Sequence, residues 1–255
     1  MSRTATIDAI YRYPVKGLSP ERLIRTRLSV GQTISNDRIY AVENGPTRFD
    51  PAAPEYLAKN HFLMLMRNAG LARLVTRYDD ATCVLTIQED AREAARGDLS
   101  TAAGRAAIEQ FLAAFCAAEL RGAPKVLHAP GFSFSDVARK VVSIINLASV
   151  AAVEDAVGAP VHPLRFRGNL YVAGWPAWHE FALIDRELAV GSSARLRVVK
   201  RIGRCAATDV DPDTGIRDMQ IPRTLLVSCG HSDCGVYAEV VADGDIAGGD
   251  VVTPV

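Results

Sequence analysis

Residues 204–215 read Arg204-Cys205-Ala206-Ala207-Thr208-Asp209-Val210-Asp211-Pro212-Asp213-Thr214-Gly215. They follow residues 196–202, in which apolar and basic residues mix as in a half-buried β-strand, and they end in a turn-forming Pro-Asp-Thr-Gly sequence. Cys205 is therefore expected at a junction between a strand and a loop. The basic residues Lys200, Arg201 and Arg204 would favour the thiolate, which is both the better nucleophile and a soft metal ligand. The alternative is a buried structural cysteine, because free cysteine is among the most buried residue types.

The composition is that of a globular protein. Of the 255 residues, 49% are hydrophobic and 23% charged, with 29 basic side chains against 29 acidic ones. A neutral balance gives no overall field for nucleic acid or an anionic membrane, so neither is expected as a partner and any anion site must be local. Residues 1–10 lack the apolar core of a signal peptide, and no run approaches about 18 apolar residues. A cytoplasmic location is expected.

The five cysteines are at positions 83, 116, 205, 229 and 234. Their number is odd and no CxxC pair occurs, which argues against a disulfide framework and against a zinc ribbon. A reducing compartment fits this pattern. Cys229, His231 and Cys234 form a candidate metal cluster, but no fourth ligand stands at a familiar spacing.

Short strand patterns dominate the chain. Two helices are expected, at 101–120 and 148–157, the latter ending at Gly158. Strands are expected at 4–13, 23–30, 36–42 (after an opening turn), 74–78, 83–87, 125–128, 141–146, 170–172, 186–190, 195–202, 237–241 and 251–252. Many short strands with few helices predict a mainly β fold with peripheral helices, built as barrel or sandwich layers. No internal repeat or low-complexity linker is evident.

Several basic residues lie where they could bind an anion. Lys16 sits in a Pro- and Gly-rich loop, and Arg38 stands at the entrance of a strand, where it can pair with Asp37 or reach into a cleft. Arg165 and Arg167 are expected on the same side of an extended segment, as an anion cradle. Each of these residues can instead be an ordinary surface charge. Arg139 and Lys140 form a further basic pair with the same alternative.

Six segments, in this order along the chain, resemble the MOSC family, the molybdenum cofactor sulfurase C-terminal domain proteins. The segments are Tyr11-Arg12-Tyr13-Pro14-Val15-Lys16-Gly17-Leu18, Asn36-Asp37-Arg38-Ile39-Tyr40-Ala41, Arg165-Phe166-Arg167-Gly168-Asn169, Arg204-Cys205 with Asp211-Pro212-Asp213-Thr214-Gly215, Gly235-Val236-Tyr237 and Gly249-Asp250. The resemblance spans nearly the whole chain. It implies a MOSC-type β-barrel with an N-terminal β-barrel-like domain, divided as residues 1–122 and 123–255.

The resemblance also implies a site. Cys205 falls where the family's cysteine ligates molybdenum, so it is expected to be both the metal ligand and the catalytic residue of a bound molybdenum cofactor (molybdopterin). The resemblance implies further residues that bind the cofactor. They match positions at which the mitochondrial amidoxime-reducing members contact the pterin phosphate or the surroundings of the metal. These residues are Lys16, Arg38, Arg167, Arg204 and Tyr237, with Asn169 beside them.

The implied activity is an oxidoreductase that reduces N-hydroxylated small molecules with electrons from a separate redox protein. Whether the chain is an enzyme stays open. The alternatives are a carrier of the cofactor or of persulfide sulfur, and a β-barrel interaction module. Three glycines depart from the amidoxime reducers: Gly17 and Gly203 replace small polar residues, and Gly168 replaces a common proline. A membrane anchor and a pyridoxal-phosphate domain are absent, so no desulfurase chemistry is expected.

Overall fold

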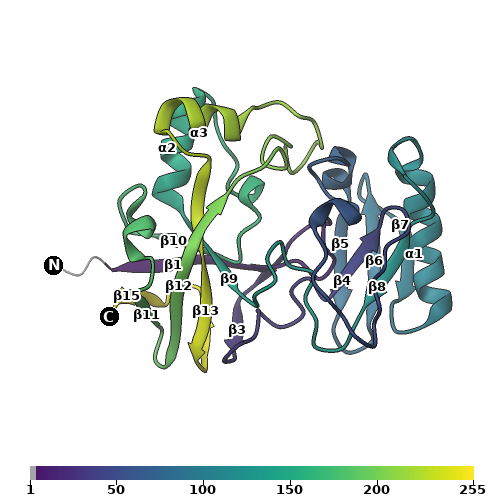
Figure 1. The fold of residues 1–255 in the computed structure, drawn as a ribbon, viewed down its shortest axis with the longest axis horizontal. Helices are drawn as coiled ribbons and strands as arrows, with labels where there is room; N and C mark the ends of the chain where they lie inside the picture. Colours follow the sequence, from purple (N-terminus) through teal and green to yellow (C-terminus); the bar gives the residue numbers. More distant parts are fainter. Residues whose placement is uncertain (1–3) are drawn as a thin grey trace.

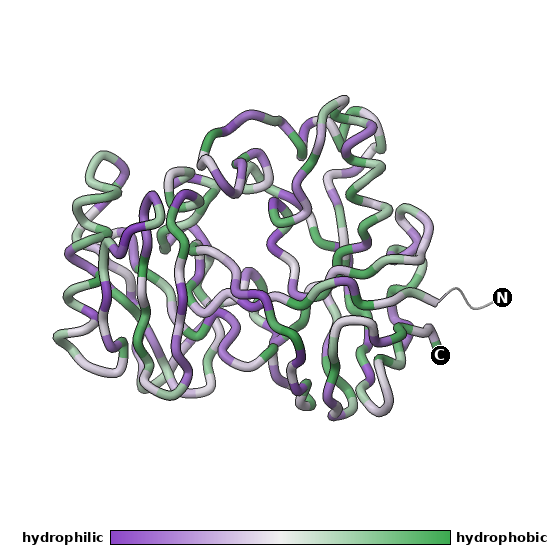
Figure 2. Tube along the Cα trace, turned by 180° about the vertical axis from the view of Figure 1, so that it is seen from behind, coloured by the Kyte–Doolittle hydropathy of each residue, from purple (hydrophilic) through white to green (hydrophobic). Residues whose placement is uncertain are grey.

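The computed structural model describes residues 4–255, and strands form most of the regular structure. Figure 1 shows two lobes side by side, with a β-barrel on the left and a smaller lobe of short strands and one helix on the right. The expectation of a mainly β fold with peripheral helices is confirmed. Figure 2 shows hydrophobic and hydrophilic residues interchanging along the strands of both lobes, as expected where one face of a strand is buried.

The barrel is closed. Among the described residues, seven strands form its wall: β10 (Leu170–Ala173), β9 (Val142–Asn146), β13 (Asp233–Ala242), β12 (Ala194–Gly203), β11 (Glu187–Val190), β15 (Val251–Pro254) and β1 (Ala5–Arg12). The ring closes because β1 pairs with both β15 and β10. The β9–β10 pair is parallel and the other wall pairs are antiparallel. The expected MOSC-type β-barrel is therefore confirmed.

Strand β12 shows how the sequence builds the wall. Its buried residues Leu196 and Val198 face the barrel core, whereas the basic residues Arg195 and Arg197 beside them are exposed. Burying each such aliphatic side chain contributes about 1.5–3 kcal/mol. The ladder with β13 shifts register at three points, and the last shift lies just before the strand ends at Gly203. The strand expected over 195–202 is confirmed.

The smaller lobe contains two sheets and a helix. Strands β5 (Val75–Asp79), β6 (Val84–Glu89) and β7 (Arg92–Asp98) form one antiparallel sheet, and β4 (Tyr40–Glu43) pairs with β8 (Lys125–His128). Helix α1 (Ala102–Phe115) begins after Thr101, whose hydroxyl accepts a hydrogen bond from the backbone N–H of Gly104. It buries Ile108 and Leu112 in the core of this lobe. The expected hairpin and helix are confirmed.

Strand pairing crosses residue 122 in both directions. Strand β1 belongs to the barrel, and β3 (Arg25–Leu28) pairs with β14 (Gly244–Ala247), while β8 pairs with β4 of the smaller lobe. The division into 1–122 and 123–255 stays a prediction, and its first three residues lie outside the described part of the chain. The described chain thus begins in the barrel, continues through the smaller lobe and ends in the barrel. Segments from both lobes therefore meet at the boundary between them.

Some elements differ from the expectation. The strand expected at 23–30 is divided into β2 (Glu21–Leu23) and β3, and β7, β14 and helix α3 (Ile221–Cys229) were not predicted. Helix α2 (Leu147–Val157) ends at Gly158 as expected, with φ of 75°. Short 3₁₀ helices complete the fold: η1 (Lys59–His61), η2 (Ala69–Arg73), η3 (Ala117–Glu119), η4 (Pro163–Phe166) and η5 (His179–Leu183). No helix within residues 4–255 has the length and apolar character needed to cross a bilayer.

Candidate functional site

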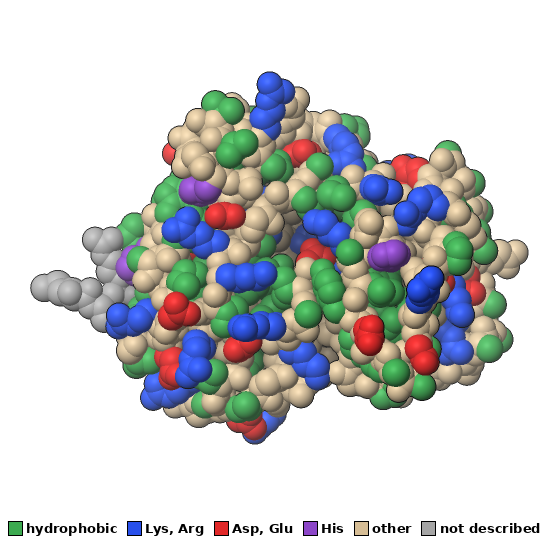
Figure 3. All heavy atoms as spheres, viewed as in Figure 1, with side chains coloured by type: hydrophobic (Ala, Val, Ile, Leu, Met, Phe, Trp, Pro, Cys, Tyr) green, Lys and Arg blue, Asp and Glu red, His purple; other side chains and the backbone are tan. Residues whose placement is uncertain are grey.

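A pocket of about 290 Å³ lies between the two lobes. Figure 3 shows it as a hollow whose floor carries both basic and acidic side chains. The sequence-predicted site residues all line it, together with others from the smaller lobe and from the connecting loops: Lys16, Arg38, Arg167, Asn169, Arg204, Cys205 and Tyr237 from the prediction, and Lys59, Met64, Leu65, Met66, Ser135 and Asp136 beside them. Tertiary structure therefore brings the predicted set into one cavity.

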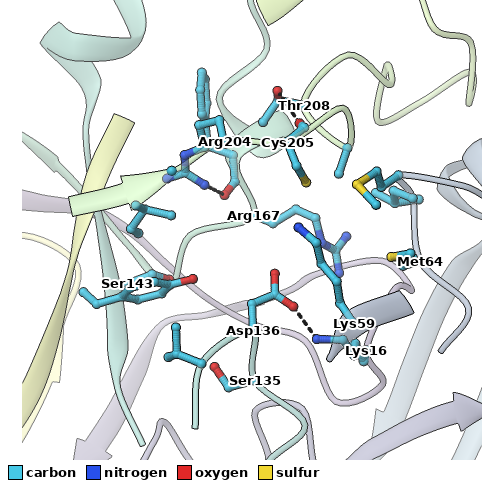
Figure 4. A pocket seen from close by; sticks show the side chains of 18 of the residues that line it. Lys16, Lys59, Met64, Ser135, Asp136, Ser143, Arg167, Arg204, Cys205 and Thr208 are labelled. Carbon is cyan, nitrogen blue, oxygen red and sulfur yellow. Dashed lines mark hydrogen bonds and ion pairs between the residues drawn. The ribbon is translucent and has the colours of Figure 1, made fainter. Parts of the chain in front are cut away.

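Cys205 follows directly after β12, at the expected junction of strand and loop. Its thiol points into the pocket in Figure 4, and the residue is half-buried. The backbone N–H and the hydroxyl of Thr208 both donate to the Cys205 carbonyl at 3.0 Å, which closes the turn behind the thiol. Farther along, the carboxylate of Asp211 accepts hydrogen bonds from the backbone N–H and hydroxyl of Thr214, at 2.8 and 2.9 Å. The Asp-Pro-Asp-Thr-Gly segment is thus a self-bonded loop that supports the cysteine.

A cation from the other lobe interacts with the thiol. Burial opposes the charge of Lys59, but a hydrogen bond and the charge of Cys205 outweigh it and raise the pKa of the ammonium group. The basic neighbours in sequence have other partners: Lys200 lies over the ring of Tyr237, and Arg201 lies over a phenylalanine ring. Lys59, from η1, thus contacts the thiol, and an effect of the sequence neighbours on it stays a prediction.

Arg38 and Arg167 form a clamp around Tyr13. The guanidinium carbons lie 4.7 and 4.3 Å from the centroid of the Tyr13 ring, which is completely buried. Both arginines have left-handed backbone conformations, with φ of 55° and 49°, which are uncommon for residues other than glycine. Arg38 also pairs with Asp37 at 2.5 Å, so it makes the expected ion pair and reaches the pocket as well. Such strained positions cluster at ligand clamps.

Lys16 is the third cation of this group, and it is buried. Its ammonium group donates to the carbonyl of Phe134 at 2.9 Å and forms an ion pair with Asp136. Burial alone would raise the pKa of Asp136, but Lys16 outweighs it and holds the pKa of the carboxyl well below its ordinary range. Burial lowers the pKa of Lys16 itself, and the nearby charges of Arg38 and Arg167 act in the same direction. The cluster therefore contains more positive charge than its surroundings stabilise.

The two arginines of the 163–170 segment do not form the predicted cradle. Residues 163–166 are the 3₁₀ helix η4 and not an extended chain, so the two side chains diverge. Arg165 is buried and binds the carboxylates of Asp211 and Asp218, at 3.0 and 2.8 Å. Arg167 instead donates to the carbonyl of Leu18 at 2.8 Å and stays in the clamp. Arg165 is thus a structural link to the loop after Cys205.

Three other predicted residues are bonded mainly within the protein. Asn169 accepts from the backbone N–H and hydroxyl of Ser143, at 3.1 and 2.8 Å, and donates to a backbone carbonyl. Arg204 donates to the carbonyls of Phe166 and Cys234, so it ties β13 to η4 beneath the pocket. Tyr237 is half-buried in the pocket wall. Contact of these residues with a cofactor stays a prediction.

The candidate metal cluster at the C-terminal cysteines does not form. Cys234 is buried in an apolar core cluster, and the described residues contain no group of three or more His, Cys, Asp and Glu side chains arranged to hold a metal ion. The sequence analysis also missed two pocket residues, Lys59 and Asp136, neither of which carries a local signal in the sequence. It contained Tyr13 only as part of a motif, and this buried ring lies against Arg38 and Arg167.

The pocket residues fit a phosphate-bearing molybdenum cofactor. Within residues 4–255, neither Lys59, Arg167 nor Arg204 has a carboxylate in an ion pair, so the pocket has a surplus of half-buried positive charge. Such a surplus suits a phosphate, which accepts several charge-assisted hydrogen bonds. The thiol of Cys205 supplies the soft donor that a molybdenum centre binds.

The chain is similar to several known proteins. The chain is 32% identical over 99 residues to mitochondrial amidoxime reducing component 2 of Bos taurus, an alignment that covers 38% of this chain and only 29% of that relative's length. The YUAD protein of Bacillus subtilis aligns over 100% of this chain and 97% of its own, with 13% identity and a TM-score of 0.49. YiiM of Geobacillus stearothermophilus aligns over 45% of this chain and 53% of its own, with 16% identity and a TM-score of 0.34.

The family match covers the part of the chain that carries Cys205. Residues 126–253 match the model of the MOSC domain, a domain associated with binding of the molybdenum cofactor. The matched region contains Arg167, Asn169, Arg204 and Tyr237 as well, and it takes in half of the chain. The protein therefore belongs to the MOSC domain family.

Proposed function

We propose that this protein holds the molybdenum cofactor in the pocket between its lobes and reduces N-hydroxylated small molecules with electrons from a separate redox protein. One observation carries the proposal: a single accessible thiol shares a cavity with a surplus of cations contributed by both lobes. The name of the bovine relative, which describes amidoxime reduction, supports the choice of substrate class. Because the chain covers a minority of that relative, the activity is inferred from the site itself.

Each residue of the pocket has a proposed task. Lys16, Arg38 and Arg167 hold the phosphate of the pterin, and Cys205 ligates the metal. The bound cofactor supplies two-electron oxygen-transfer chemistry next to Cys205. Lys59 lines the same pocket, and its ammonium group interacts with the Cys205 thiol.

The remaining walls suit a small, largely apolar substrate. Met64, Leu65 and Met66 from the smaller lobe line the pocket, together with Ala207 from the loop after Cys205. Asp136 stays ionised at neutral pH because its pKa is lowered, so it can accept a hydrogen bond from a substrate N–H or O–H. The overall reaction balances as R–NH–OH + 2 e⁻ + 2 H⁺ → R–NH₂ + H₂O, and the electrons come from the redox partner.

Metal content and turnover test this proposal. The full chain, purified from a host that makes the cofactor, should contain near-stoichiometric molybdenum and should reduce an aromatic amidoxime repeatedly when dithionite is supplied. Cys205→Ala should lose both properties while its circular dichroism spectrum is unchanged. The matched control is Cys83→Ala, which removes a half-buried thiol outside the pocket and should retain both.

Two results would contradict the proposal. Wild-type protein without molybdenum under these conditions would exclude cofactor binding. Loaded protein that fails to reduce several N-hydroxylated compounds, yet transfers its cofactor to a molybdenum-free acceptor enzyme, would identify a carrier instead.

The phosphate contacts have their own test. Each charge-assisted contact contributes about 1.5–3 kcal/mol, so Lys16→Ala, Arg38→Ala or Arg167→Ala should reduce cofactor retention by roughly tenfold or more. Retention equal to that of wild type in all three variants would show that these cations do not bind the phosphate.

A further inference from the structure

The outer face of β12 carries a row of exposed basic side chains that leads to Cys205. Arg195 and Arg197 alternate with the buried core residues Ala194, Leu196 and Val198, so they point away from the barrel core, and Lys200 and Arg201 are exposed farther along the same strand. Arg139 joins them, since it pairs with Glu239 on the neighbouring strand β13. These five residues are called the basic stripe. In Figure 3, basic side chains border the hollow on the barrel side.

The acids near the basic stripe do not neutralise it. Three carboxylates face it: Glu187 lies 2.7 Å from Arg197, Glu239 lies 3.3 Å from Arg139, and Asp233 lies 4.0 Å from Arg201. Arg195 and Lys200 have no ion pair in the part of the chain that is described. Because the whole chain has a net charge of zero, this positive charge is a local feature and not a consequence of composition.

The stripe has the size of a docking surface. The nine residues of β12 from Arg195 to Gly203 span about 26 Å. A standard interface covers about 800 Å² on each partner, which is a patch of similar width. A protein that covered the stripe would therefore also cover the mouth of the pocket, where the proposed reaction needs electrons. Lys200 and Arg201 belong to both the stripe and the pocket wall.

We infer that the basic stripe is the docking surface for a small acidic redox protein, which delivers one electron at each encounter, so that two encounters supply the two electrons of each turnover. The inference rests on the proposed reduction and adds the charge and the position of the electron donor. Opposite charges steer such an encounter and raise the association rate, mostly at low salt.

The test compares two reductants on the cofactor-loaded full chain. One is a reduced flavodoxin of strongly negative net charge, and the other is dithionite, which does not need a docking surface. The variant Arg195→Glu/Arg197→Glu reverses two charges of the stripe outside the pocket. We expect kcat/KM for flavodoxin to fall about tenfold, and the dithionite-driven rate to change less than twofold. The neutral variant Arg195→Gln/Arg197→Gln should lie between the two, and raising the salt should remove the difference.

The matched control is Arg92→Glu/Arg96→Glu, which reverses two exposed charges on β7 of the smaller lobe. An equal loss in this control, or no loss in the stripe variant, would overturn the inference. So would a stripe variant that loses only binding to phosphatidylserine vesicles, because the partner would then be a lipid surface. Absence of dithionite-driven turnover in the wild type would instead contradict the proposed function. In that case, binding of oxidised flavodoxin to the wild type and to the stripe variant would still test whether the basic stripe is a docking surface.

Discussion

Replacing Tyr13 with leucine is expected to weaken phosphate binding more than it weakens the fold. The guanidinium carbons of Arg38 and Arg167 lie 4.7 and 4.3 Å from the centroid of the Tyr13 ring, so both cations rest on this ring. Each cation–π contact of this kind contributes about 0.5–2 kcal/mol. Without the ring, two like charges on strained backbones lose the group that places them, so we expect Tyr13→Leu to lower the affinity for phosphate at least about tenfold.

The assay uses apo protein from a host that cannot make the cofactor, titrated calorimetrically with inorganic phosphate. Tyr13→Phe keeps the ring and loses only a 3.3 Å hydrogen bond from the hydroxyl to the carbonyl of Gly168, so its affinity should stay within about threefold of wild type. Tyr78→Leu is the matched control, because Tyr78 is also buried but lies in the smaller lobe against another tyrosine. It should lower the melting temperature without changing phosphate affinity.

The reasoning about Tyr13 would be refuted by a simple result. If Tyr13→Leu binds phosphate as tightly as wild type, while its melting temperature falls as in Tyr78→Leu, the ring only fills space in the core. A Tyr13→Phe variant that loses binding as severely as Tyr13→Leu would also refute it, because the hydroxyl and not the ring would then be responsible.

Three further predictions concern stability. Asp136→Asn should cost about 1 kcal/mol at pH 7. Because the folded-state pKa of Asp136 lies well below its ordinary value of 3.8, the difference in melting temperature from wild type should begin to shrink as the pH falls below about 4 and should close only at still lower pH. Glu180→Ala should lower the free energy of unfolding, measured in urea, by about 2–4 kcal/mol. The substitution removes the acceptor of hydrogen bonds from the buried side chains of Asn146 and Ser149. Gly17→Ser should lower the melting temperature, since φ is 86° and a Cβ would lie 2.6 Å from the Leu63 carbonyl oxygen, whereas Gly203→Ser should be tolerated.

The glycines show why the departures from the amidoxime reducers could not be interpreted from sequence alone. Gly17 and Gly203 look alike as replacements of small polar residues. In the structure, Gly17 has a left-handed backbone and lies close to the Leu63 carbonyl. A Cβ on Gly203 would contact only Asp233, at 3.6 Å. The local backbone therefore requires glycine at position 17. At position 203, in the pocket wall, a side chain would fit.

Much of the fold follows from local patterns in the sequence. The hydrophobic period along β12, the Gly158 end of α2 and the helix that begins after Thr101 are encoded by neighbouring residues, so they were predictable. Helix α3 was missed because its apolar face is short, and β14 because a four-residue strand becomes recognisable only when it pairs with β3. Short elements depend on partners that are distant in sequence.

The candidate site divides in the same way. The motif around Cys205, and the basic residues at 16, 38 and 167, were visible in the sequence because each carries a local signature of turn, strand or charge. Only the tertiary structure placed Tyr13 between two arginines, directed Arg165 away from them and brought Lys59 from the other lobe to the thiol. The sequence determines which charged side chains are available. The packing of the two lobes determines which basic side chains come together in the pocket with too few carboxylates to neutralise them. This excess of positive charge is what makes the pocket a site for an anion.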